Sequence, residues 1–166
     1  RDAVILPSAP DQAPEIATVS RDGKLRLLTL TPQGPRWETV YEAPMGMGRI
    51  AMKPGATRTS VVLYTTHDDG RILRHERGAS REWVSEVIYL GPQGARGVAA
   101  GRFAADPATE TVAIYGYSKK VEILARAKGR WSVTTAFEGL AEGHWITTAE
   151  VDGRNATDEL VVCGFD

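Results

Sequence analysis

The sequence predicts an all-β protein built from repeats of four antiparallel strands. Three observations carry this prediction. The chain resembles itself at regular intervals, each repeat contains β-branched runs too short for a helix, and no stretch shows helical periodicity over three turns. The 166 residues, of which 42% are hydrophobic and 25% charged, suffice for one folded domain with a core and exclude bulk disorder.

A tryptophan marks each repeat. Trp37, Trp83 and Trp131 recur at intervals of 46 and 48 residues, each after a turn and an alternating segment. Because apolar residues in such strands face inward, we expect the three tryptophans to lie in the core between neighbouring sheets. A short β-branched run precedes each turn, at residues 16–19, 61–64 and 112–115, and a fourth copy lies at 160–163.

Each repeat is interpreted as four strands in order. The first follows a glycine-rich loop, at 48–52, 97–100 and 143–147, and the second is the β-branched run. Asp22-Gly23 and Asp69-Gly70 predict type I′ hairpins into the third strand, within 20–30, 67–77 and 117–127. The fourth strand carries the tryptophan.

Four antiparallel strands per repeat are typical of β-propeller blades. The prediction is a single, partial propeller over 1–166 with about three and a half blades: about 2–47, 48–96 and 97–142, and a partial blade at 143–166. Because propellers close with about 4–8 blades, we expect the remaining blades from a longer chain, which is favoured, or from self-association.

The composition excludes several classes of protein and of binding partner. Twenty Lys and Arg against twenty-one Asp and Glu leave a net charge of −1, which predicts no nucleic-acid partner, and no apolar run is long enough to insert into a membrane. The one cysteine, Cys163, excludes an internal disulfide framework and is expected to be a small core residue. His67 and His75 show no metal-ligand spacing and are expected at the surface.

The segment 149–162, AEVDGRNATDELVV, resembles the FG-GAP/VCBS repeat family, whose blades carry a pattern close to D-x-D-G-D-G-x-x-D-L-V-V between their first two strands. Residues 100–113 keep this frame in a decayed form, and 11–19 and 53–63 resemble it more weakly. The resemblance implies a propeller that serves as an extracellular or periplasmic binding scaffold. Some members bind Ca²⁺ in this loop, and a few are lyases.

The resemblance also places a degenerate calcium loop in the last repeat. Matched onto the family pattern, the ligand positions fall on Glu150, on Asp152, and on Asp158 or Glu159. Arg154 replaces a third carboxylate and Asn155 the turn glycine, and a cation in the ligand ring repels the metal. We therefore expect only weak Ca²⁺ binding at Glu150, Asp152 and Asp158; alternatively these acids cap turns. No other cofactor is implied.

In a propeller, the loops before each first strand and the turns after each second strand share one face. Candidate ligand-binding residues on these loops are Arg49, Arg96, Lys119, Lys120, His144 and Trp145. Cations and aromatic rings around a channel suit an anionic or sugar-like ligand. The alternative is that the cations only keep the rim soluble.

No G-x-S-x-G elbow, P-loop, HExxH or CxxCH motif is present. The leading interpretation is a non-catalytic scaffold that binds a protein or glycan partner. One alternative is part of a polysaccharide lyase or hydrolase, with His144, Lys119 and Lys120 as the channel groups of this half. The other is a structural accessory domain of a larger multidomain protein.

Overall fold

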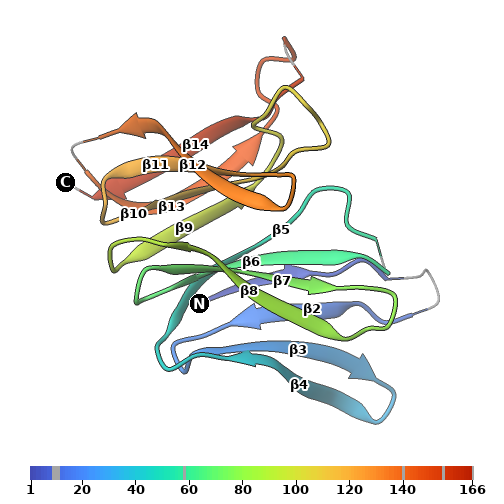
Figure 1. The fold of residues 1–166 in the computed structure, drawn as a ribbon. Coiled ribbons are helices and arrows are strands. Elements are labelled where there is room, and N and C mark those ends of the chain that lie inside the picture. Colours follow the sequence, from blue (N-terminus) through green and yellow to red (C-terminus); the bar gives the residue numbers. More distant parts are fainter. Residues whose placement is uncertain (9–11, 58, 140, 155, 166) are drawn as a thin grey trace.

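The computed structural model describes residues 1–8, 12–57, 59–139, 141–154 and 156–165. Within these ranges the chain forms fourteen β-strands and no helix (Figure 1). None of the described residues therefore belongs to a helix long and apolar enough to cross a membrane. The strands are β1 (Asp2–Ile5), β2 (Glu15–Val19), β3 (Lys24–Thr31), β4 (Gly34–Glu42), β5 (Met47–Met52), β6 (Val61–His67), β7 (Arg71–Arg77), β8 (Trp83–Leu90), β9 (Ala95–Ala100), β10 (Glu110–Gly116), β11 (Lys120–Ala127), β12 (Arg130–Glu138), β13 (Glu142–Ala149) and β14 (Glu159–Phe165).

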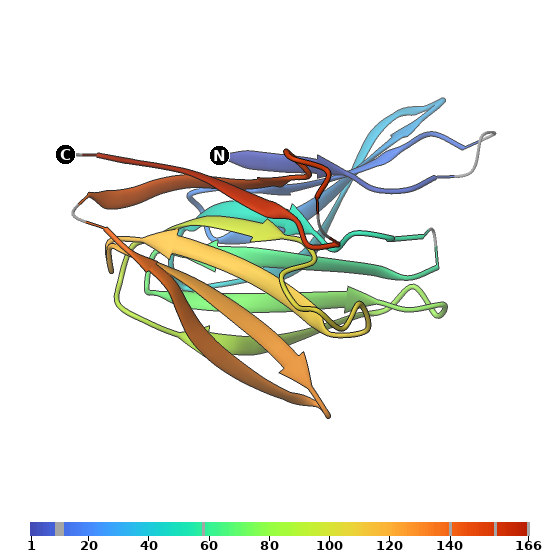
Figure 2. The same ribbon diagram turned by 90° about the horizontal axis from the view of Figure 1, so that it is seen from above.

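The strands form antiparallel sheets in chain order. Sheet 1 contains β1 to β4, sheet 2 β5 to β8, sheet 3 β9 to β12, and sheet 4 the pair β13 and β14. The all-β prediction and the prediction of four-stranded antiparallel sheets are confirmed. The first strands of successive sheets are neighbours: β5 contacts β1 and β9, and β9 contacts β13 (Figures 1 and 2).

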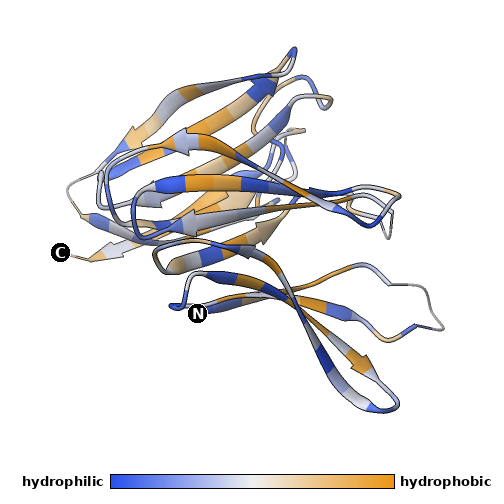
Figure 3. Ribbon diagram, turned by 60° about the horizontal axis from the view of Figure 1, so that its bottom comes forward, coloured by the Kyte–Doolittle hydropathy of each residue, from blue (hydrophilic) through white to orange (hydrophobic). Residues whose placement is uncertain are grey.

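Hydrophobic and hydrophilic residues are interspersed along the strands (Figure 3). Buried apolar side chains form three clusters, one between each pair of successive sheets. We call the face of a sheet that lies toward the next sheet its back face, and the opposite face its front face. Ala17 and Val19 on the back of sheet 1 share a buried cluster with Val61 and Leu63 on the front of sheet 2. Both faces of sheets 2 and 3 are covered in this way, which places the core between the sheets.

The turns after the second strand differ from the predicted type I′ form. In the first turn the Gly23 N–H bonds the Ser20 carbonyl at 3.2 Å, and only Gly23, with a φ of 77°, has a positive φ, so Asp22 does not. This is a type I turn closed by a left-handed residue. Sheet 2 repeats it with Gly70, and sheet 3 with Lys119 at a φ of 63°.

Two residues expected in the core are exposed. Trp37 on β4 is 55% exposed, whereas Trp83 and Trp131 pack against the clusters between sheets. Trp37 lies on the front of sheet 1, which no sheet of this structure covers. Cys163 is also exposed, because it lies on β14 and faces away from sheet 3. Both predictions were wrong for the same reason, since each residue lies on an outer face of the stack.

The expectation that His67 and His75 lie at the surface was also wrong. Both rings are fully buried between sheets 1 and 2, and both Nε2 atoms lie 2.9–3.0 Å from Thr65 Oγ1. His75 Nδ1 lies 2.7 Å from Ser85 Oγ, and Tyr41 packs against both rings. One hydroxyl donates only one hydrogen bond, so Thr65 donates to one histidine and accepts from the other. Although β7 is rich in polar residues, His75 on this strand therefore belongs to a buried chain of side-chain hydrogen bonds.

Candidate functional site

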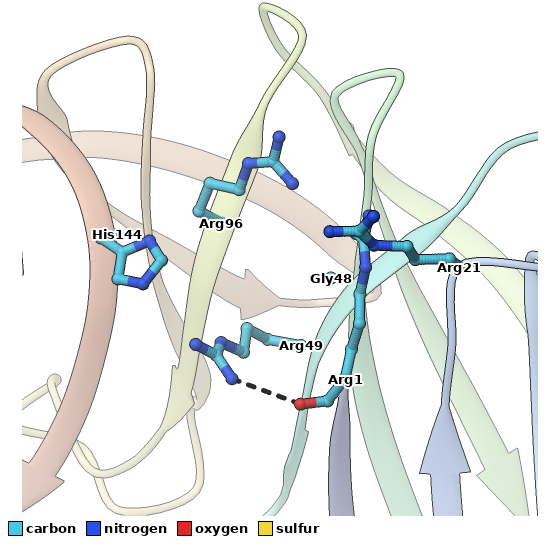
Figure 4. A pocket seen from close by; sticks show the side chains of 6 residues that line it. All are labelled: Arg1, Arg21, Gly48, Arg49, Arg96 and His144. Atoms are coloured by element: carbon cyan, nitrogen blue, oxygen red, sulfur yellow. Dashed lines mark hydrogen bonds between the residues drawn. The ribbon is translucent and has the colours of Figure 1, made fainter.

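Four arginines and a histidine surround one hollow at the end of the stack where the first strands begin (Figure 4). Its volume is about 240 Å³. The lining residues come from all four sheets and their loops: Arg1, Arg21, Gly48, Arg49, Arg96 and His144. We call this set the arginine hollow. Three of the six predicted ligand-binding residues, Arg49, Arg96 and His144, are thus brought together.

The charges in the arginine hollow are unequally paired. Asp68 accepts hydrogen bonds from Arg1 at 2.9 Å and from Arg96 at 3.1 Å. Among the described residues, the Arg49 guanidinium donates only to the backbone carbonyl of Arg1, at 3.5 Å, and Arg21 makes no ion pair. Among the described residues, Asp68 is the one carboxylate that pairs with these four guanidinium groups, so positive charge is in excess among the lining residues, which favours anions.

Local structure holds the arginines in place. A side chain on Gly48 would lie 2.7 Å from Thr66 Oγ1, so glycine lets β5 approach β6 here. That hydroxyl accepts the Arg49 N–H at 2.9 Å, which fixes the backbone of Arg49. Arg96 stacks on the Tyr117 ring at 5.0 Å and donates to its hydroxyl at 3.1 Å. The Arg96 side chain is therefore held by two residues, whereas the Arg49 guanidinium has one long hydrogen bond, to the Arg1 carbonyl at 3.5 Å.

The other predicted ligand-binding residues lie elsewhere. Trp145, 41% exposed, lines a neighbouring cavity of about 210 Å³ between the first strands, together with Arg49. Lys119 and Lys120 do not line the arginine hollow. Lys120 pairs with Glu138 at 3.6 Å on the outermost strand of its sheet, and Lys119 occupies the left-handed turn position. Lys119 is therefore part of the turn, and Lys120 forms an ion pair within sheet 3.

Sequence reasoning missed Arg1, Arg21 and Asp68. The last two occupy the same position of successive turns, the second residue of 20–23 and of 67–70, and Tyr117 occupies it in the third turn. Arg96 bonds both Asp68 and Tyr117, so this turn position points toward the hollow. Aligning the turns by this position would have identified Arg21 and Asp68.

The acidic loop of the last repeat brings together the acids at the first two matched positions and Glu159, one of the two alternatives for the last position. Glu150, Asp152 and Glu159 offer oxygens within 4.8 Å of one another. Asp158 instead accepts from the Arg102 backbone N–H at 2.7 Å and its guanidinium at 3.3 Å. Backbone N–H groups donate to all three clustered carboxylates, as expected for turn caps. Asn155 lies outside the described residues.

Several titratable groups with strongly perturbed pKa values lie between sheets. Between sheets 2 and 3, Glu110 accepts hydrogen bonds of 2.6 Å from both the Tyr64 hydroxyl and the Arg74 guanidinium. Burial by itself raises the pKa of Glu110, but these two bonds outweigh it and hold the pKa below its ordinary value. Burial, and then the bond to Glu110, raises the pKa of Tyr64. These groups join sheets.

The chemistry available in the arginine hollow is recognition of an anion. Guanidinium groups form forked, charge-assisted hydrogen bonds to carboxylate, sulfate and phosphate oxygens. No hydroxyl, thiol or carboxylate among its lining residues is positioned as a nucleophile or general base beside His144, whose ring packs on Phe165 with centroids 4.5 Å apart. Neither protein-family models nor curated proteins match the sequence of this chain.

Proposed function

We propose that this chain is part of a β-propeller of the FG-GAP/VCBS kind and that it is a non-catalytic scaffold, which binds an anionic group of a protein or glycan partner in the arginine hollow. The observation that carries the proposal is the excess of guanidinium groups around one hollow. Arg21 and Arg49 have no carboxylate partner among the described residues. They line the hollow together with Arg1, Arg96 and His144. The family resemblance supports an extracellular or periplasmic location within this proposal.

The order of the sheets supports the propeller part of the proposal. Four sheets follow one another in chain order, and the first strand of each lies beside the first strand of the next. The turns after the second strands and the loops before the next first strands are joined by backbone hydrogen bonds, as from Ala43 to Gly23 and from Gly91 to Gly70. Such loops on a rigid scaffold are common binding sites.

The residues have distinct proposed roles. Asp68 holds Arg1 and Arg96 in a fixed orientation, so their remaining N–H groups are preorganised toward a ligand. Arg49 is the group we expect to contribute most, because it surrenders no ion pair when it binds an anion. Trp145, on the adjoining cavity wall, offers an apolar face for a sugar ring.

Part of a lyase or hydrolase remains the second candidate. It requires an acid–base set that converges on the hollow, and of the three groups expected for it only His144 lines the hollow. The scaffold is therefore favoured. A screen for activity on acidic polysaccharides with wild-type protein and His144→Ala separates the two, since catalysis would be lost in the variant and binding would persist.

The proposal is tested by titrating the chain with a heparin hexasaccharide, which carries carboxylates and sulfates, and with neutral dextran as a comparison. Arg49→Gln removes a cation from the hollow, and Arg130→Gln removes an exposed cation from the β11–β12 hairpin. A charge-assisted hydrogen bond contributes about 1.5–3 kcal/mol, so R49Q should weaken binding at least about tenfold. Equal losses in R49Q and R130Q, or equal affinity for dextran, would overturn the proposal.

A further inference from the structure

A second cavity, which we call the inner cavity, lies between the first strands of the four sheets. Its volume is about 210 Å³, and its lining residues come from β1, β5, β9 and β13. Arg49 lines both the inner cavity and the arginine hollow, so one side chain belongs to the walls of both. Small-molecule sites usually measure about 300–1,000 Å³, a range that the hollow and the inner cavity reach only together. A ligand with two linked parts would therefore suit them.

Small side chains keep space open between the first strands. One position carries a small residue in three successive sheets: Ala51 on β5, Ala99 on β9 and Thr147 on β13. All three line the inner cavity. A side chain on Gly97 would lie 2.7 Å from Ile146 Cγ2, so β9 and β13 also approach each other closely here. A larger residue at the repeated position would fill part of the inner cavity.

The charged groups of the inner cavity are one carboxylate and one guanidinium. Asp2 accepts the Ala3 N–H at 3.0 Å and the Ile50 N–H at 3.2 Å, one on each oxygen. An ionised carboxylate accepts about four hydrogen bonds, so each oxygen of Asp2 can accept another. The Arg49 guanidinium donates only one long bond, to the Arg1 carbonyl (Figure 4), and neither Asp2 nor Arg49 forms an ion pair among the described residues. The inner cavity therefore offers both acceptors and donors.

The hollow and the inner cavity thus favour different chemical groups. The residues that line the hollow contribute four guanidinium groups and a histidine but no carboxylate, which favours an anion. In the inner cavity, Asp2 repels an anion and accepts hydrogen bonds from hydroxyl groups, while Arg49 donates. A sugar hydroxyl is both a donor and an acceptor, so a neutral sugar ring matches this pair of residues.

We propose that the ligand is an acidic glycan that occupies both volumes, with its anionic group in the arginine hollow and the adjoining neutral sugar ring in the inner cavity. This inference rests on the proposed function and selects a glycan over a protein as the partner. Arg49 contacts both parts of the glycan, because it lines both volumes. Asp2 supplies the preference for a sugar, since an acidic peptide has an anionic group but no ring of hydroxyls.

The test compares glucuronic acid with the disaccharide in which glucuronic acid is linked to N-acetylglucosamine, each titrated into the chain and followed by NMR. Because a hydrogen bond from a sugar hydroxyl to Asp2 is charge-assisted, the disaccharide should bind at least about tenfold more tightly. Asp2→Asn should abolish this gain. If Asp2 acted only through its charge, D2N would instead strengthen binding of both ligands, which would overturn the inference.

Two controls accompany D2N. The asparagine oxygen can still accept the Ile50 N–H, so circular dichroism melts should show an intact fold. Asp106→Asn changes an exposed carboxylate that also accepts a backbone N–H, that of Ala108 at 2.9 Å, but lies outside both cavities. D106N should therefore keep the preference for the disaccharide, and its loss in D106N as well as in D2N would contradict a specific role of Asp2.

Arg49→Gln separates failure of this inference from failure of the proposed function. R49Q should weaken binding of both ligands. Glucuronic acid that does not bind, or that binds R49Q as tightly as wild type, would overturn the proposed function and this inference with it. If glucuronic acid requires Arg49 but the disaccharide binds no more tightly, or if the acidic dipeptide N-acetyl-Asp-Ala binds as tightly as the disaccharide, only the assignment of a glycan is overturned.

Discussion

Removing the Glu110 carboxylate is predicted to destabilise the contact between sheets 2 and 3 severely. Its side chain is only 9% exposed and bonds the buried Tyr64 hydroxyl and the Arg74 guanidinium, whose side chain is 6% exposed. Lys53 adds a weaker contact at 3.4 Å. In Glu110→Ala the buried guanidinium loses its partner in sheet 3 and keeps Glu76 at 2.7 Å and Glu86 at 3.6 Å within its own sheet, and the Tyr64 hydroxyl loses its acceptor.

The magnitude follows from the burial of the partners. Losing a charge-assisted hydrogen bond costs about 1.5–3 kcal/mol, and leaving a buried hydroxyl without its acceptor costs about 1–3 kcal/mol. Because Arg74 keeps two carboxylate partners, we expect the two losses together to cost about 3–5 kcal/mol. For a chain of this length each kcal/mol lowers Tm by about 2–4 °C, so the expected decrease is about 6–20 °C. Because the pKa of Glu110 is held below its ordinary value, its contribution is present at neutral pH and is lost as the pH falls through the folded pKa.

The assay is equilibrium urea denaturation of wild type, Glu110→Ala and Glu138→Ala at pH 7. Glu138 is the matched control, since it also pairs with a lysine, at 3.6 Å, but is 66% exposed. Exposed pairs contribute about 0–1 kcal/mol, so E138A should be nearly neutral. If E110A and E138A lower the free energy of unfolding equally, the buried cluster does not join the sheets.

Three further predictions concern single sites. Burial lowers the pKa of His67 to about 4, helped by Arg71, and that of His75 to about 3, helped by His67, so the unfolded chain binds these protons first. The free energy of unfolding should therefore fall by about 1.4 kcal/mol per histidine for each pH unit below 6.5, toward pH 4, and a flat denaturation profile there would contradict this. Lys119→Gly should raise the unfolding free energy by about 0.5–1 kcal/mol, since glycine adopts a left-handed φ without strain; a lower Tm would refute the assigned turn. Asp158→Ala should cost about 1–2 kcal/mol equally in EDTA and in excess Ca²⁺, because its partner is Arg102; a cost confined to Ca²⁺ would place Asp158 in a metal site.

The sheets were predictable because local pattern determines them. Each second strand is a short β-branched run, each turn ends in a residue that tolerates or adopts a left-handed φ, and alternation assigns the faces. Because the sequence repeats, the strands assigned in one repeat also predicted those of the next. Trp83 and Trp131 pack between sheets as expected, because sheets precede them in the stack.

The misplaced residues depend on what covers each strand, which local pattern does not contain. Trp37 and Cys163 have the same sequence context as buried residues and are exposed because they lie on outer faces. His75 lies on a strand of polar appearance, yet Thr65 and Ser85 complete its hydrogen bonds in the interior. Residue type alone does not reveal such partners.

The arginine hollow was predicted only in part for a related reason. Arg49 and Arg96 follow from the loop before each first strand, whereas Arg21 follows only when the turns are aligned by their second residue. Asp68 was not recognised as the carboxylate that orders the site, because its partners lie far away in the sequence.

Arginine side-chain NMR would show whether the arginine hollow binds an anionic group, as we propose. The Nε–Hε signals of the chain would be followed while heparin hexasaccharide is added. We expect the signals of Arg49, Arg96 and Arg21 to shift first and to saturate together, while that of Arg130 stays in place. Shifts spread evenly over all exposed arginines, or shifts that spare Arg49, would contradict it.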